Sequence, residues 1–156
     1  MSNKKEIGLA IIGCGTIGRI RAMMAKDYPG ISWIGLCDIN EELGKKLLND
    51  CEADFFTTDY NDLVKRSEVN AVIIATDENH HFGPIMASLE NESSLFIEKP
   101  LATDLVESRD VLNKIKSTNV DAVLGYTQRF RRRFLAVKQK LMDQKIGHVT
   151  SVVTRA

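Results

Sequence analysis

The 156-residue sequence contains little of what builds disulfide frameworks, zinc sites or membrane spans. Its three cysteines, Cys14, Cys37 and Cys51, form no C-x-x-C pair, which argues against a disulfide framework or a zinc site and fits a reducing compartment. No apolar run is long enough to cross a membrane, and the first run is too short and too broken by glycine for a signal peptide. We therefore expect a cytoplasmic protein without a metal site.

An excess of charge of either sign is also lacking. Lysine and arginine total 21, as do aspartate and glutamate, so no bulk field would attract nucleic acid or a membrane, and neither is an expected partner. The one basic cluster, Arg129 with residues 131–133, is typical of a solvated helix face. With 44% hydrophobic and 27% charged residues, the composition indicates an ordinary globular protein of one domain or slightly more.

Short apolar segments alternate with longer segments of helical period. This alternation predicts parallel strands joined by crossover helices. The segments are apolar nearly throughout, as strands covered on both faces are. The expected strands are residues 7–13, 32–38, 54–58, 71–76, 94–99 and 122–126. Capping residues before the expected helices are Asn40, Asp59 and Asp104. The expected fold class is α/β, a doubly wound parallel sheet of the Rossmann type.

The pattern changes after Tyr126. Residues 129–147 have the apolar spacing of one long helix, and residues 148–156 alternate like a new strand. We therefore expect a dinucleotide-binding domain over 1–126, a connecting helix over 127–147, and the first strand of a second domain over 148–156.

The strongest motif is G-x-G-x-x-G at Gly13, Gly15 and Gly18, which follows the first expected strand and opens a helix. Gly13 permits a tight turn, Gly15 lets the backbone approach a pyrophosphate, and Gly18 lets helix and strand pack closely. Asp38, at the end of the second strand, would accept hydrogen bonds from ribose hydroxyls and repel a 2′-phosphate. Since Ile39 follows it where an NADP enzyme often has arginine, NAD is favoured over NADP. The alternative is a plain strand–turn–helix connection with a solvent-facing Asp38.

Three later strands also end in polar residues. In a doubly wound sheet, ligands bind beyond the carboxyl ends of the strands, so these residues are candidates to face a cofactor or substrate. They follow the fourth, fifth and sixth expected strands and include Thr76, Asn79, His80, His81, Glu98, Lys99, Gln128 and Arg129.

Taken in order, the strings "AIIGCGTIG", "CD", "AT" with a histidine five residues past the threonine, "EKP", and "GYTQRF" followed by "KIG" resemble the glucose–fructose oxidoreductase, inositol dehydrogenase and rhizopine catabolism (Gfo/Idh/MocA) family. The resemblance covers nearly the whole chain. It implies an N-terminal Rossmann domain, a C-terminal α/β domain with an open sheet, and NAD(P)-dependent oxidation or reduction of sugars, inositols and related carbonyl compounds.

By this resemblance, Lys99 is catalytic and lies beside the nicotinamide, where its ammonium bonds the ribose and polarises a substrate oxygen. Glu98 orients Lys99 or bonds the cofactor, and Pro100 shapes the chain exit through a cis peptide. A surface ion pair at a turn is the alternative for Glu98 and Lys99, and a packing role is the alternative for His81. The implied cofactor-binding residues are Gly13, Gly15, Thr16, Ile17, Gly18, Asp38, Ile39, Ala75, Thr76, Asn79, His81, Glu98, Lys99, Gln128 and Arg129.

Two departures from the family pattern stand out. Asp77 stands where the family usually has proline, which makes the field near the cofactor more negative. The family also continues for about another domain, which carries the acid–base pair, most of the substrate pocket and the sheet used for dimerisation. We therefore expect residues 1–156 to bind NAD with little turnover, and a homo-oligomer only with that domain. A stand-alone NAD-binding or sensing module is the alternative.

Overall fold

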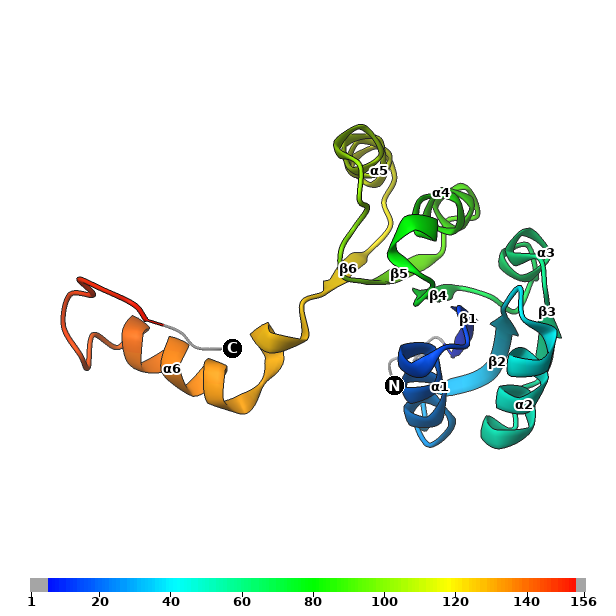
Figure 1. Ribbon diagram of the computed structural model, residues 1–156, viewed down its shortest axis with the longest axis horizontal. Coiled ribbons are helices and arrows are strands. Elements are labelled where there is room, and N and C mark those ends of the chain that lie inside the picture. The colour runs from blue at the N-terminus through cyan, green and yellow to red at the C-terminus, as the bar shows by residue number, and fades with distance from the viewer. Residues whose placement is uncertain (1–5, 154–156) are drawn as a thin grey trace, which may run out of the picture. The chain divides into compact units, whose positions relative to one another are not determined.

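The computed structural model describes residues 6–153, and the chain divides into two units, Met1–Gly125 and Tyr126–Ala156. The first unit contains a six-stranded sheet whose strands are all parallel, in the order β3-β2-β1-β4-β5-β6 (Figure 1). The strands are β1 (Ile7–Ile12), β2 (Ile31–Cys37), β3 (Phe55–Thr57), β4 (Ala71–Ile74), β5 (Ser94–Glu98) and β6 (Ala122–Gly125). The expected α/β fold is confirmed, and the six strands expected within residues 7–126 are all present.

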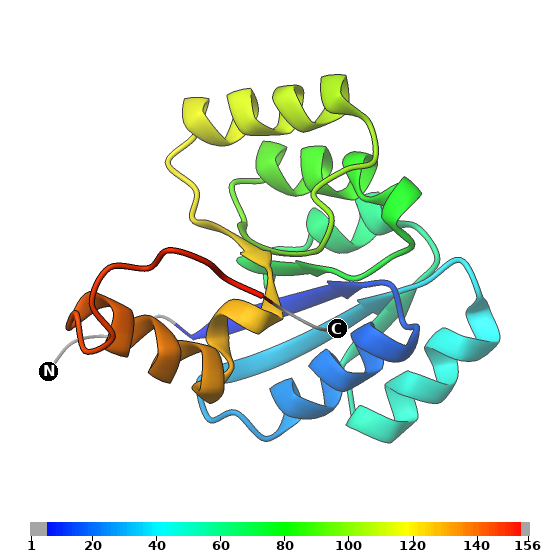
Figure 2. The same cartoon turned by 60° about the vertical axis from the view of Figure 1, so that its left-hand side comes forward.

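Five helices and one short 3-10 helix connect these strands, and the helices cover both faces of the sheet (Figure 2). On one face lie α1 (Thr16–Lys26) and α2 (Glu41–Cys51), and on the other lie α3 (Tyr60–Val64), α4 (Phe82–Glu90) and α5 (Leu105–Ser117). The 3-10 helix η1 (Glu78–His80) precedes α4. The helix after β1 and the helix after the neighbouring β4 therefore leave the sheet on opposite faces, which creates a crevice between them at the carboxyl edge.

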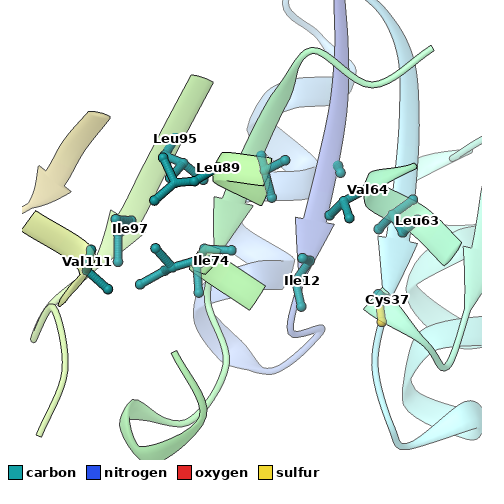
Figure 3. Close-up of a cluster of buried hydrophobic side chains, with 12 residues drawn as sticks. Ile12, Cys37, Leu63, Val64, Ile74, Leu89, Leu95, Ile97 and Val111 are labelled. Atoms are coloured by element: carbon teal, nitrogen blue, oxygen red, sulfur yellow. The ribbon is translucent and has the colours of Figure 1, made fainter. Parts of the chain in front are cut away.

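The core forms two layers because successive strand residues point to opposite faces of the sheet. Ile11 packs with the layer under α1 and α2, while its neighbour Ile12 packs with the layer under α3, α4 and α5. Both are almost fully buried. Figure 3 shows the second layer, in which Leu89 of α4 and Val111 of α5 lie near strand residues such as Ile97. Burial on both faces explains why these strands read as continuous apolar runs.

The helix starts follow the expected capping residues. Asn40 accepts a hydrogen bond from the Leu43 N–H, and Asp59 accepts one from the Asn61 N–H. Asp104 accepts from the N–H groups of the second and third residues of α5. These bonds satisfy amides that have no partner inside the helix, so the local chemistry sets where α2, α3 and α5 begin.

The second unit differs from the expectation of one long helix. A 3-10 helix, η2 (Thr127–Phe130), comes first, and α6 (Arg132–Met142) follows. Arg131 between them has an extended backbone, with φ −69° and ψ 133°, so it interrupts the helix. The left-handed backbone of Gln144, φ 53°, follows the end of α6.

The expected strand over 148–156 is wrong for residues 148–153, which form no strand, and residues 154–156 lie outside the described residues. A strand needs a hydrogen-bonding neighbour, and the described part of this unit contains no other strand. Across residues 6–153, no helix combines the length and apolarity needed to cross a bilayer.

Candidate cofactor site

The turn between β1 and α1 uses its three glycines in different ways. Gly13 has φ +99°, and a Cβ there would lie 2.5 Å from the Ala75 carbonyl carbon. A Cβ on Gly18 would overlap the Gly13 carbonyl oxygen. At Gly15, which precedes the first turn of α1, no atom of the described residues other than its own chain neighbours lies within 4 Å of where a Cβ would stand. The turn therefore needs two glycines for its own fold and keeps open space at the third, as expected for a pyrophosphate-binding turn.

Asp38 follows β2 and its carboxylate is held by two backbone groups. The Cys14 N–H donates to Oδ2 at 2.7 Å and the Asn40 N–H donates to Oδ1 at 2.8 Å. The carboxylate is thus fixed against the glycine turn and keeps further lone pairs for hydroxyl donors. Burial, and then the Asp38 charge, raise the pKa of the Cys14 thiol to about 12, so Cys14 is a packing residue without a reactive thiolate.

A cavity of about 580 Å³ lies at the carboxyl ends of β1, β2 and β4. It is lined by Ile12, Gly13, Gly15, Cys37, Asp38, Ile39, Leu43, Thr58, Tyr60, Ala75, Thr76, Asp77, Asn79, His80, Phe82, Gly83, Pro84 and Glu107. Seven of the expected cofactor residues are among these: Gly13, Gly15, Asp38, Ile39, Ala75, Thr76 and Asn79. The fingerprint turn and the end of β4 therefore meet at one site, as the strand-end argument predicts.

The charge of this cavity is negative. It includes the carboxyl groups of Asp38, Asp77 and Glu107, and no lysine or arginine of the described residues lines it. The Asn79 backbone N–H, which donates to Asp77, lowers the pKa of that carboxyl below its usual value, so it stays ionised. A pyrophosphate would be bound by amides at the start of α1, whereas an additional 2′-phosphate beside Asp38 would meet no lysine or arginine among the lining residues that the structure describes.

Two observations test whether a dinucleotide suits these residues. The first concerns Thr76, which lines the cavity. Its hydroxyl is buried and has no hydrogen-bond partner among the described residues. A buried hydroxyl without a partner is costly, and a ligand hydroxyl or amide would satisfy it. The open space at Gly15 is the second observation, because it leaves the helix N-terminus accessible. The residues present fit NAD.

His81 does not line the cavity, whereas its neighbour His80 does. Only 1% of His81 is exposed, and its Nδ1 lies 2.8 Å from the Pro100 carbonyl oxygen. Its Nε2 lies 3.4 Å from the Thr76 carbonyl oxygen. His81 thus joins the loop after β4 to the loop after β5, and its role in cofactor binding stays a prediction.

Glu98 is the last residue of β5 and Lys99 follows it, and neither lines the cavity. Glu98 is buried and bonded to Arg21 of α1, while Lys99 is exposed. The Lys99–Pro100 peptide is cis, which confirms that expectation. Sequence reasoning missed Arg21, because its partner is 77 residues away and no local pattern marks it.

The remaining expected residues lie outside the cavity lining. Thr16 and Ile17 form the first turn of α1, where Ile17 is 44% exposed, and Gly18 is buried beneath them. Gln128 and Arg129 belong to η2 in the second unit, where the Arg129 N–H donates to the Tyr126 carbonyl oxygen at 2.9 Å. Their part in cofactor binding stays a prediction.

Several lining residues were not predicted. Tyr60 begins α3, and its hydroxyl would lie 2.8 Å from a Cβ on Gly83, so the two residues pack closely. Glu107 lines the cavity from the first turn of α5. Tyr60 follows the end of β3 by three residues, and this position was its only signal in the sequence, whereas Glu107 follows the end of β5 by nine residues and had no such signal.

Comparison with known proteins matches these features. The family model for the Gfo/Idh/MocA group, described as an oxidoreductase family with an NAD-binding Rossmann fold, matches residues 7–126. The myo-inositol 2-dehydrogenase of Thermotoga maritima is 25% identical over 149 residues, which are 94% of this chain and 45% of the relative. The scyllo-inositol 2-dehydrogenase (NAD⁺) of Bacillus subtilis is 25% identical over 143 residues, 91% of this chain and 42% of the relative.

A solved structure shows the same fold. The scyllo-inositol dehydrogenase of Lactobacillus casei, crystallised with NAD(H) and scyllo-inositol, superimposes with a TM-score of 0.88 at 24% identity. The match covers 94% of this chain and 44% of that protein. The chain therefore spans less than half the length of the relatives it matches. With its fingerprint turn, its anchored Asp38 and a family match over most of its length, the chain belongs to the Gfo/Idh/MocA oxidoreductase family and forms the NAD-binding Rossmann part of it.

Proposed function

We propose that this chain is the cofactor-binding half of an NAD-dependent dehydrogenase of the sugar and inositol type. The observation that carries the proposal is the cavity itself. One wall is the accessible N-terminus of α1 at Gly15, and another is Asp38, whose carboxylate accepts two backbone hydrogen bonds. No lysine or arginine of the described residues lines the cavity. Amide donors suit a pyrophosphate and a fixed carboxylate suits ribose hydroxyls, which together favour NAD over NADP.

The chain's residues would divide the work of binding. The amides at the start of α1 bond the pyrophosphate, and Asp38 accepts hydrogen bonds from the adenosine ribose. Thr76 and Asn79, after β4, offer a hydroxyl and an amide to the rest of the dinucleotide. When bound, NAD supplies the nicotinamide that accepts or returns a hydride.

Lys99 is the residue proposed to act in the reaction. Its ammonium would bond the nicotinamide ribose and stabilise negative charge on the substrate oxygen as the hydride leaves or joins the adjacent carbon. The proton of the substrate hydroxyl needs an acceptor, which we place in the substrate domain that the family's longer members carry. General acid–base assistance contributes about a hundredfold or more, so the chain alone should turn over little.

The substrate and the assembly are also proposals. The names of the inositol dehydrogenases in the comparison support a small polyol, a sugar or a related carbonyl compound as substrate. Residues 148–156 would lead into the substrate domain, and homo-oligomers would form through that domain's sheet. We expect this chain alone to be a monomer that binds the dinucleotide.

A second candidate is a module that binds or senses NAD without chemistry. The specific observation that favours it is that Lys99 does not line the cavity. The two candidates differ in whether Lys99 contributes to the binding of the nicotinamide half. A sensor that recognises only the adenosine and pyrophosphate has no use for it.

Calorimetric titration of the purified chain with NADH and with NADPH tests the proposal. We expect clear binding of NADH and much weaker binding of NADPH. Lys99→Met should weaken NADH binding without affecting ADP, which lacks the nicotinamide ribose, whereas Lys116→Met, an exposed lysine on α5, serves as the matched control. An unchanged NADH affinity in Lys99→Met would favour the sensing module.

A turnover assay completes the test. The chain is mixed with NAD⁺ and myo-inositol or scyllo-inositol, and absorbance at the NADH maximum is followed. Little or no NADH should form. Steady turnover by this chain alone would show that it contains its own proton acceptor and would overturn the proposed division of labour.

A further inference from the structure

Arg21 and Glu98 form an ion pair that ties α1 to the end of β5. The Arg21 Nε donates to Glu98 Oε1 at 2.9 Å, and Nη2 donates to the same oxygen. The residues are 77 positions apart, and only 9% of Glu98 is exposed. The pair lies on the α1 face of the sheet, the opposite face from the His81 contact to Pro100.

The surroundings of the pair are largely apolar. The guanidinium carbon of Arg21 lies 4.9 Å from the centroid of the ring of Phe96, which precedes Glu98 by two residues and so lies on the same face of the strand. Arg21 and Phe96 also line a groove of about 450 Å³ whose other residues include Met24, Tyr28 and Val123. A carboxylate beside such a surface is poorly solvated, so its position depends on the cation that pairs with it.

The side of Glu98 that faces β6 is tightly packed. Glu98 is in register with Gly125 of β6, and a Cβ on Gly125 would lie 3.0 Å from Glu98 Oε2. The carboxylate therefore has little room to turn toward β6. If Arg21 were lost, Glu98 would have to move toward water, and the strand end would move with it.

Lys99 stands between two anchored neighbours. Arg21 holds Glu98 on one side, and His81 lies 2.8 Å from the carbonyl oxygen of Pro100 on the other. We infer that Arg21 is a positioning residue: by holding Glu98 it fixes the backbone from which Lys99 projects. This inference rests on the proposed function, in which Lys99 meets the nicotinamide half of NAD. Arg21 does not line the cofactor cavity.

Titration of the variant Arg21→Met with NADH and with ADP tests the inference. ADP carries the adenine, one ribose and the pyrophosphate, so it reports the Gly15 and Asp38 end of the site only. Loss of one well-placed charged hydrogen bond should weaken NADH binding by about tenfold, while ADP affinity stays within about twofold of the original. A role confined to general stability would weaken both ligands alike.

Arg19→Met is the matched control, because Arg19 lies on the same helix and pairs with Asp50 on the exposed surface. It should change neither affinity. The double variant Arg21→Met with Glu98→Gln removes the unpaired charge, so it should recover part of the lost NADH affinity. If Arg21→Met alone folds poorly, the NADH and ADP affinities can still be measured on the double variant.

The outcomes separate the inference from the proposed function. If Lys99→Met weakens NADH binding but Arg21→Met does not, the proposed function stands and the positioning role is overturned. If Arg21→Met weakens NADH and ADP equally, the positioning role is also overturned. If Lys99→Met leaves NADH binding unchanged, both fall, because Lys99 then has no part at the nicotinamide end.

Discussion

At the scale of single residues, the glycine turn separates requirements of the fold from requirements of the ligand. Gly13 and Gly18 are needed because a Cβ at either would meet backbone atoms. A Cβ at Gly15 would meet no atom of residues 6–153 beyond its chain neighbours, so packing within this part of the chain does not require a glycine there. The motif thus contains two glycines that the fold requires and one that only ligand binding requires.

This difference predicts opposite effects of two alanine substitutions. Gly15→Ala should leave the free energy of unfolding unchanged or raise it by about 0.4–1 kcal/mol, because the unfolded chain loses freedom, while NADH affinity falls at least about tenfold. Gly18→Ala, the matched control, should lower the free energy of unfolding by about 1–3 kcal/mol through overpacking. Urea denaturation and calorimetric titration measure the two quantities. A Gly15→Ala protein that binds NADH normally would contradict the proposed position of the pyrophosphate.

The buried thiols give a prediction about pH. Burial, followed by the Asp38 charge, raises the pKa of Cys14 and Cys37 from 9.0 to about 12. At pH 8 both thiols should react with iodoacetamide about a hundredfold or more slowly in the folded chain than in urea, because the thiolate is the reactive form. Mass spectrometry of quenched samples gives the rates.

The same shifts set the sign of a stability effect. Above pH 9 the unfolded chain loses thiol protons that the folded chain retains, so these groups make the free energy of unfolding fall as pH rises from 9 toward 12. Cys37→Ala should make that fall less steep. A slope unaffected by the substitution would mean that Cys37 titrates alike in both states.

At the scale of elements, local signals were enough to predict most of the fold. All six strands were predicted because their apolar runs reflect burial on both faces, and the helix starts were predicted because Asn40, Asp59 and Asp104 bond the first amides. The break at Arg131 was not predicted, since the residues on both sides of it have helical spacing. The extended backbone of Arg131 does not alter the spacing of the apolar residues, so that spacing does not predict it.

The Asp104 cap gives a prediction for one helix. Asp104→Ala should lower the free energy of unfolding by about 1 kcal/mol, because the Val106 and Glu107 amides lose their acceptor. Asp104→Asn, which retains an accepting oxygen, is the control and should cost much less. Since Glu107 lines the cofactor cavity from this first turn, NADH affinity should also change slightly in the alanine variant. Urea denaturation of the original chain and the two variants measures these free energies of unfolding.

At the scale of the whole molecule, the site follows from the sheet order. Strands β1 and β4 are neighbours although three helices and two strands separate them in sequence, and their connections leave on opposite faces. The glycine turn and Asp38 were predicted because they form a known sequence spacing. Tyr60 and Arg21 were not, because their contacts arise only when distant segments fold together.

Binding at this site should stabilise the fold as a whole. At a free NADH concentration about 100 times the dissociation constant, the free energy of unfolding should rise by about 2.7 kcal/mol. Thermal unfolding with NADH, with NADPH and without ligand measures the effect. NADPH should give a much smaller shift because Asp38 opposes a 2′-phosphate. Equal shifts with the two dinucleotides would contradict the role assigned to Asp38.

The open space beside Gly15 has a consequence for how such sequences diverge. Selection for folding alone retains Gly13 and Gly18 but places no constraint on Gly15. A protein that no longer bound the dinucleotide could therefore acquire alanine or serine at position 15 without losing its structure. In a mutant library sorted for expression, other residues should appear at position 15, while Gly13 and Gly18 should be retained. Sorting the same library for dinucleotide binding should select glycine at position 15 again. The residue at this position therefore indicates whether a chain still binds its cofactor.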